Sequence, residues 1–193
     1  FSRLPGFIKR EEDPSPLEPP LNSHAHSSAP AGPEDRLQAR IYARKFTANI
    51  TKRKMSEYNH PDDAVRIVGI FPQQVEAGPF KVGFQPISHS IPESSALVID
   101  TPVGRIVHSG DFKVDLTPGV GEPFDPAAFE GIAKDGIKAL VCDSTNVFSQ
   151  HPGRSEASLP EAITELVKSA EGMVVATTFA SNVARVKTLA VAG

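Results

Sequence analysis

The segment from Pro86 to Asp115 constrains the fold most strongly, because it predicts a β-hairpin. Two short runs rich in β-branched residues, 96–99 and 105–108, flank the sequence Thr-Pro-Val-Gly at 101–104. Proline at the second position of a turn already has the required φ, and glycine is common at the fourth position. The chain is therefore expected to contain a sheet in which these two strands are neighbours.

Two potential metal ligands flank this hairpin. His89 stands just before the first strand and Asp111 stands just after the second. Antiparallel pairing would bring both side chains to related places at one edge of the sheet. An imidazole and a carboxylate together suit zinc or manganese. A histidine beside a loop is more often solvated or hydrogen-bonded than a metal ligand, so the spacing alone leaves both interpretations open.

Five stretches of the sequence carry a specific resemblance to a known family. They are SHSIPES at 88–94, HSGDFK at 108–113, GEP at 121–123, CDSTN at 142–146 and TTFASN at 177–182. Over roughly residues 40 to 193 the chain resembles the ribonuclease J family of metallo-β-lactamase/β-CASP nucleases. The resemblance implies an α/β fold: a partial metallo-β-lactamase-like αββα sandwich that runs into the start of a β-CASP α/β domain.

The resemblance also implies a division of the chain into three parts. Residues 1–35, rich in proline, are expected to be a disordered or poorly matching N-terminal segment. Residues 36–145 would form the partial metallo-β-lactamase domain. Residues 146–193 would form the start of a truncated β-CASP domain.

Site roles follow from the same resemblance. Asp111 would bridge two metal ions and His89 would bind one of them. Asp143, in its Asp-Ser-Thr context, would lie beside the active site and act with Asp111 in catalysis. The implied cofactor is zinc, two ions per site, with manganese or magnesium as alternatives. His24 and His26 would complete the first metal position.

The histidine motif at the N-terminal side is degenerate. The family motif is His-x-His-x-Asp-His, whereas here Ser28 stands in place of the aspartate and Ala29 in place of the last histidine. Serine is a poor zinc ligand and alanine is none, so the second metal position would lose two donors. Either His24 and His26 are remnants of the motif, or the match is due to chance.

The implied activity is that of a cytoplasmic ribonuclease. Such an enzyme trims RNA from a 5′ end and also cuts internally, in ribosomal RNA maturation and messenger turnover. Its partners would be RNA and further copies of itself, as a homodimer or homotetramer. Because the chain starts at Phe1 and stops at Gly193, directly after a helical pattern, we expect a fragment that is inactive alone.

Composition limits the functional classes only weakly. The 193 residues suffice for one domain, or one and part of a second, and the net charge of −3 gives no global attraction to RNA. The single cysteine, Cys142, excludes an internal disulfide framework and fits a reducing cytoplasm. No apolar run is long enough to span a membrane, so we expect a protein without a membrane partner.

Two local features suggest contacts with phosphate. The stretch 36–54 is basic and lacks acidic residues, and it makes Arg44 and Lys45 candidates for RNA binding. The alternative is the solvated face of a helix. Ser181 and Asn182 open a helix after TTFASN, where free backbone N–H groups favour an anion. The alternative there is ordinary N-capping by Ser181.

Further elements follow from local patterns. Strands are expected at 41–43, 65–71 and 79–87, as a buried strand ending at Cys142, and as another buried strand at 173–178. Helices are expected after Phe46, at 125–134, from a Ser158/Glu161 capping box to about Ala170, and from Ser181 onward.

Three other functions compete with the ribonuclease hypothesis. The first is a different metallo-β-lactamase-fold hydrolase that acts on DNA or a small ester. The second is a non-catalytic remnant that binds RNA through the basic stretch or docks on a partner. The third is a defective copy with no biochemical role.

Overall fold

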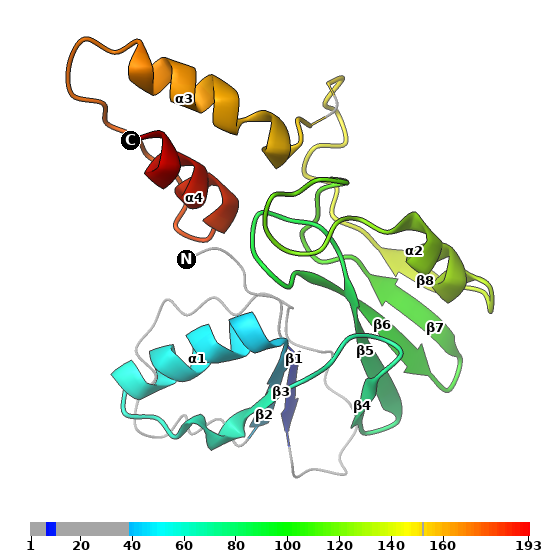
Figure 1. The fold of residues 1–193 in the computed structure, drawn as a ribbon. Helices are drawn as coiled ribbons and strands as arrows, with labels where there is room; N and C mark the ends of the chain where they lie inside the picture. The colour runs from blue at the N-terminus through cyan, green and yellow to red at the C-terminus, as the bar shows by residue number, and fades with distance from the viewer. Residues whose placement is uncertain (1–6, 11–38, 152) are drawn as a thin grey trace.

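Two β-sheets form the centre of the computed structural model, which describes residues 7–10, 39–151 and 153–193 (Figure 1). The strands are β1 (Phe7–Arg10), β2 (Ala39–Ala43) and β3 (Val65–Ile67) in the small sheet, and β4 (Gln74–Ala77), β5 (Phe80–Pro86), β6 (Ser95–Thr101), β7 (Gly104–His108) and β8 (Ala139–Val141) in the large sheet. The helices are α1 (Lys45–Glu57), α2 (Pro126–Ala133), α3 (Pro160–Lys168) and α4 (Val183–Ala192), with 3-10 turns at Asp62–Ala64 and Glu156–Ser158.

The first helix, the two sheets and α2 form four layers. Ala48 of α1 packs on the small sheet against Ala43 and Val65. On the opposite face of the small sheet, Tyr42 packs against the apolar residues of the large sheet, which include Phe84. The alternation of side chains along β2 explains why neighbouring residues face different layers.

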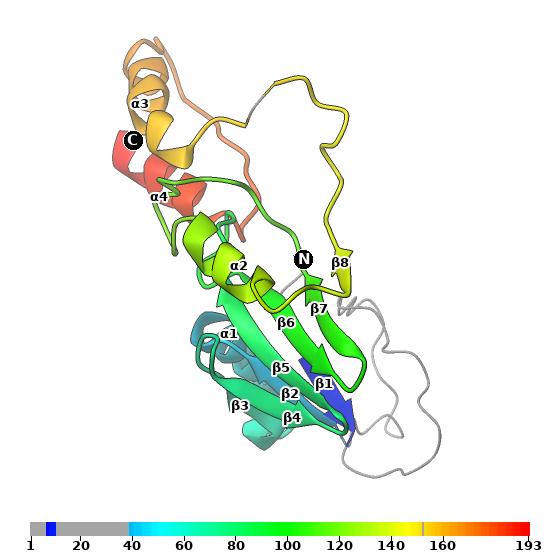
Figure 2. The same ribbon diagram turned by 90° about the vertical axis from the view of Figure 1, so that its right-hand side faces the viewer.

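The outer layer is α2, which covers the other face of the large sheet. Ile132 packs there against Val98 of β6 and Val107 of β7. The order α1, small sheet, large sheet, α2 can be followed across Figure 1, and both views place α3 and α4 together, beyond the sheets (Figure 2). The predicted α/β class is confirmed.

The predicted hairpin is confirmed as β6 and β7. The two strands are antiparallel, and Thr101 is opposite Gly104, so Pro102 and Val103 form the turn. The Thr101 hydroxyl donates to the Gly104 carbonyl at 2.7 Å and accepts from the Val103 N–H at 3.2 Å. This side chain therefore closes the turn that proline and glycine predict.

Other predictions that rest on local sequence are also confirmed. Asp125 caps α2 by accepting hydrogen bonds from the N–H groups of Ala127 and Ala128, and Pro126 is its first residue. Strands β2 and β5 and helix α1 lie where the sequence predicts them.

The strand expected at 65–71 ends at Ile67, and β4 was not predicted. Within the segment 1–35, Phe7–Arg10 form β1 and pair with β2.

The prediction that the strand ending at Cys142 is buried is wrong. Strand β8 pairs with β7 alone and lies at the edge of the large sheet. Leu140 is 62% exposed, and the Cys142 side chain is exposed as well. An apolar run predicts burial only where layers cover both faces of the strand, and in the described residues β8 lacks that cover.

Two further predictions are corrected in the C-terminal part. Residues 173–178 pair with none of the described strands and are exposed, with Met173 at 92%. The Ser158/Glu161 capping box is absent, because the Ser158 hydroxyl donates to the Ser155 carbonyl inside a 3-10 turn. Helix α3 instead begins at Pro160, after Leu159, which makes no side-chain cap.

Across the part of the chain that is described, no helix combines the length and apolarity needed to cross a membrane.

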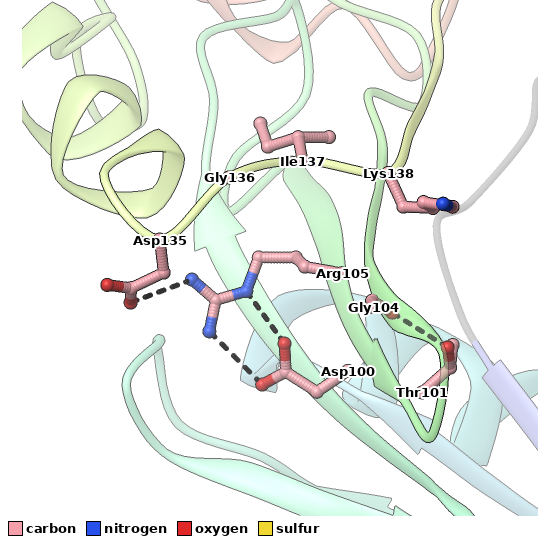
Figure 3. Close-up of a pocket in the computed structure, with 8 residues that line it drawn as sticks. All are labelled: Asp100, Thr101, Gly104, Arg105, Asp135, Gly136, Ile137 and Lys138. Carbon is pink, nitrogen blue, oxygen red and sulfur yellow. Dashed lines mark hydrogen bonds and ion pairs between the residues drawn. The ribbon is translucent and has the colours of Figure 1, made fainter.

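A pocket of about 440 Å³ lies at the turn end of the hairpin (Figure 3). Arg105 crosses it and donates to both carboxylate oxygens of Asp100, at 2.7 and 3.3 Å. The same guanidinium donates to the Ile132 carbonyl at 3.0 Å, near the end of α2. The charge of Arg105 is already matched by carboxylates, and its N–H donors join α2 to the hairpin. We therefore interpret this pocket as structural.

The Asp100–Arg105 pair predicts a dependence of stability on pH. The hydrogen bonds from Arg105 are the main cause that holds the pKa of Asp100 below its ordinary value of 3.8. A carboxylate whose pKa is lower in the folded than in the unfolded state stabilises the fold at pH values above its unfolded-state pKa. This stabilisation is lost as the pH falls through its folded-state pKa. Asp100→Asn should therefore lower the free energy of unfolding by about 1 to 2 kcal/mol at neutral pH, with a smaller difference in acid.

Urea unfolding of both proteins between about pH 7 and pH 3 measures this effect. Asp135→Asn is the matched control, because Asp135 is exposed and lies 3.8 Å from the same guanidinium. An Asp100→Asn deficit that stays constant over the whole pH range would contradict the prediction.

Candidate functional site

Three loops that carry predicted site residues meet at one edge of the large sheet. His89 lies between β5 and β6, Asp111 follows β7, and Asp143 follows β8. Strand β6 is antiparallel to both β5 and β7, and β8 is parallel to β7. The ends of β5, β7 and β8 and the start of β6 therefore all lie at the same edge.

The pKa of His89 reflects its burial and the charges near it. Burial is the largest effect on the pKa of His89 and lowers it below the ordinary value of 6.5. The charges of Asp111 and Asp143 act in the opposite direction, and the charge of Lys113 lowers it further. The net lowering favours a neutral imidazole at neutral pH, so a ring nitrogen has a lone pair for a metal or a proton.

Asp143 is held as a carboxylate by hydrogen bonds. Its Oδ1 accepts from the Thr145 hydroxyl at 2.6 Å and from the Thr145 N–H at 2.9 Å. Those two bonds are the main causes that lower its pKa, and the backbone of Phe112 and the charge of His89 add to them, while burial opposes. The carboxylate of Asp143 is thus hydrogen-bonded to the backbone of Phe112, the residue after Asp111.

Gly110 lets the chain turn directly after β7. It has φ +62°, a conformation that favours glycine, and its N–H donates to Nδ1 of His108 at 3.0 Å. Nδ1 of His108 is therefore engaged in the turn that leads to Asp111.

A charge cluster beside the site was not predicted from the sequence. Asp115 is 3% exposed, and its carboxylate accepts from the N–H groups of Thr117 and Glu156 at 2.9 and 3.0 Å. Lys113 lies 3.6 Å from Asp115 and 3.5 Å from Glu156, and Arg185 of α4 donates to both oxygens of Glu156.

The pKa of Asp115 shows how this cluster is stabilised. Burial would raise the pKa, but hydrogen bonds from Ser155, Glu156 and Thr117, together with the charge of Lys113, hold it below the ordinary value. The cluster joins the loop after Asp111 to the 3-10 turn before α3 and to α4. In the sequence, this cluster is marked by Lys113 of the HSGDFK stretch, for which the sequence alone predicts no role.

The described residues do not form a metal site by themselves. Within residues 7–10, 39–151 and 153–193, no group of three or more His, Cys, Asp or Glu side chains could hold a metal ion. His24 and His26 lie outside the described residues. His89 and Asp111 are suitable donors by chemistry, whereas the Asp143 carboxylate already accepts several hydrogen bonds. A bound metal would need further donors.

The candidate phosphate contacts occupy different surroundings. Arg44 is buried, forms an ion pair with Glu122, and has an Nη1 atom without a hydrogen-bond partner among the described residues. Lys45 is exposed at the first position of α1. In the same helix, Lys52 pairs with Asp62, and Arg53 and Lys54 pair with Glu57, so part of the basic stretch is neutralised.

At the start of α4, Asn182 is the capping residue. Its side chain accepts from the Arg185 N–H at 3.0 Å, so the expected alternative of capping by Ser181 is wrong. Asparagine satisfies one N–H that a phosphate would otherwise contact. Anion binding by Ser181 and Asn182 stays a prediction.

No family model matches the chain. Relatives that match the chain in sequence are ribonucleases. One from Sinorhizobium meliloti is 37% identical over 192 residues, 97% of this chain and 34% of that protein; one from Corynebacterium glutamicum is 35% identical over 148 residues, 76% of this chain and 20% of that protein.

Both of these relatives are ribonuclease J. A third example, from Thermus thermophilus, is 33% identical over 153 residues, 77% of this chain and 26% of that protein. The chain is thus related in sequence to part of ribonuclease J, and it spans about a third or less of the length of these relatives.

A solved structure supports the fold alone. The crystal structure of a protein of unknown function from Enterococcus faecalis V583 matches 77% of this chain and 38% of that chain. The TM-score is 0.53 and the sequence identity is 20%.

The hydrogen bond from Thr145 predicts a measurable change at Asp143. Thr145→Val removes the hydroxyl that contributes most to lowering the pKa of Asp143, so this pKa should rise toward 3.8. Carboxyl ¹³C NMR titration of Asp143 measures it. Thr101→Val, at the opposite end of the hairpin, is the control and should leave Asp143 unchanged. An unchanged titration of Asp143 in Thr145→Val would show that the hydroxyl does not act on it.

Proposed function

We propose that this chain is part of a ribonuclease J-like, metal-dependent ribonuclease that hydrolyses phosphodiester bonds in RNA processing and decay. The observation that carries the proposal is the meeting of His89, Asp111 and Asp143 at one sheet edge. Each of these residues lies in a stretch that resembles the family, and the sequence relation to ribonuclease J covers nearly the whole chain. Exonucleolytic cutting from the 5′ end and internal cutting are both part of the proposal.

We also propose a finer assignment of the fold. The layer order α1, small sheet, large sheet, α2 supports a metallo-β-lactamase-like αββα arrangement for residues 36–145. The helices α3 and α4 pack on each other beyond the sheets, which supports residues 146–193 as the start of a second, β-CASP-like domain. In the complete protein, copies of this unit would assemble as a dimer or tetramer.

The site residues support chemistry with a divalent metal. Neutral His89 and the carboxylate of Asp111 are the donors that zinc prefers, with manganese or magnesium as alternatives. In this kind of hydrolysis, a metal would supply an activated water and stabilise the charge that develops on the phosphate. Ionised Asp143 lies close enough to His89 for its charge to oppose the lowering of the His89 pKa, and so Asp143 can orient groups at this edge.

Inactivity of the chain alone follows from its donors. The described residues do not include enough ligands for one metal, and Ser28 and Ala29 replace two donors of the family motif. A non-catalytic RNA-binding role has weaker support, because Arg44 is buried and three other cations of the basic stretch are paired.

Metal content is the first test. The purified chain should retain well below one zinc ion per chain, because the residues that the structure describes hold no complete donor group. Restoring the motif with Ser28→Asp and Ala29→His should raise the content, and adding Asp111→Ala should abolish the gain. Metal analysis by mass spectrometry after dialysis measures it. A stoichiometric metal that Asp111→Ala leaves in place would contradict the site.

A chimera tests the activity itself. The corresponding third of Sinorhizobium meliloti ribonuclease J is replaced by this chain and assayed on 5′-monophosphorylated RNA with zinc or manganese. We expect no degradation with Ser28 and Ala29 present, and degradation once Asp and His replace them. Asp111→Ala should then reduce the rate by about 100-fold or more.

The controls separate the alternatives. The unmodified Sinorhizobium meliloti enzyme sets the reference rate, and DNA and a small ester serve as other substrates. A folded, restored chimera that cleaves an ester but not RNA would favour a different hydrolase. Metal-dependent RNA cleavage by the isolated chain, abolished by His89→Ala, would contradict inactivity.

A further inference from the structure

We propose that two buried serines, Ser88 and Ser109, are positioning residues that fix the spacing of His89, Asp111 and Asp143. This inference rests on the proposed function in so far as those three residues form its site. Ser88 directly precedes His89, and Ser109 lies two residues before Asp111. Each serine joins its own loop to another loop of the site.

Ser88 joins the His89 loop to the loop after Asp111. Its side chain is among the most buried in the described residues, at 1% exposure. Its hydroxyl donates to the Lys113 carbonyl and accepts from the Asp115 N–H at 3.1 Å. In addition, its carbonyl accepts from the Lys113 N–H at 2.9 Å. The backbone beside His89 is thus bonded three times to the segment that follows Asp111.

Ser109 joins the Asp111 loop to Asp143. Its side chain is 6% exposed, and its hydroxyl accepts from the Asp143 N–H at 2.9 Å and donates to the Gly110 carbonyl at 2.7 Å. Its N–H donates to the Val141 carbonyl at 2.8 Å, beyond the end of the β7 ladder. Asp143 is therefore held by its backbone as well as through its carboxylate.

A hydroxyl suits both positions because it donates and accepts at once. In each serine the hydroxyl donates to a carbonyl and accepts from an N–H on a segment that no strand ladder pairs. Alanine would leave the N–H of Asp115 or Asp143 without that acceptor in a buried or partly buried place, which favours rearrangement of the loop. Since His89 and the two carboxylates lie on these loops, their mutual distances would change.

The test measures the loops directly, without RNA or metal. Ser88→Ala and Ser109→Ala are compared with the parent chain by NMR of the His89 ring, assigned with His89→Gln, and by amide hydrogen exchange. The Asp115 amide should exchange about tenfold faster or more in Ser88→Ala, and the Asp143 amide likewise in Ser109→Ala. In both variants the His89 ring signal should move.

Thr101→Val is the matched control. It removes a hydroxyl with the same pattern, one bond donated and one accepted, at the opposite end of the same hairpin. The His89 signal should stay in place in this variant, although its unfolding midpoint falls. Ser109→Thr keeps the hydroxyl and should give the His89 signal of the parent chain. If Ser88→Ala fails to fold, the comparison of Ser109→Ala with Ser109→Thr still tests the positioning role.

The outcomes are distinct. A His89 signal that stays in place while the amide exchange rises would reduce the serines to local structural residues and overturn the proposal. A signal that moves equally in Thr101→Val would also overturn it. Because the readout needs neither RNA nor zinc, a moved signal supports the positioning role even where the chimera shows no ribonuclease activity.

Discussion

The pairing of β5 to β8 is the constraint on which the site depends. Strand direction alone decides that the loops after β5, β7 and β8 lie at one edge of the sheet. A shift of one residue in the β6–β7 register would reverse the faces of the strand, because side chains alternate. Val107 would then leave α2, and the layer order would be lost. The geometry of the site is thus set by the same contacts that form the core.

Much of the large sheet could be predicted because its signals are local. The turn at 101–104 follows from the fixed φ of proline and from glycine, and α2 follows from the cap at Asp125. The approach of His89 to Asp111 follows from antiparallel pairing. The resemblance to ribonuclease J, confirmed by the relatives, added the expectation that Asp143 belongs to the same edge.

What could not be predicted depends on contacts between distant segments. Apolar runs at 139–141 and 173–178 predict buried strands, but burial is decided by the layers around a run and not by its composition. Arg44 looks like a surface cation until Glu122 is brought beside it. Likewise, the roles of Ser88 and Glu156 arise from hydrogen bonds and ion pairs between separate loops, which leave no periodic signal in a sequence.

The short turn of the hairpin has a consequence for chain entropy. Pairing β6 with β7 closes a loop of two residues, Pro102 and Val103, whereas pairing β7 with β8 closes a much longer one, from His108 to Ala139. The entropic cost of closure grows with loop length. The half of the site on the hairpin, which carries Asp111, is therefore less costly to assemble than the half that brings in Asp143, and mild denaturant should separate Asp143 from the edge first.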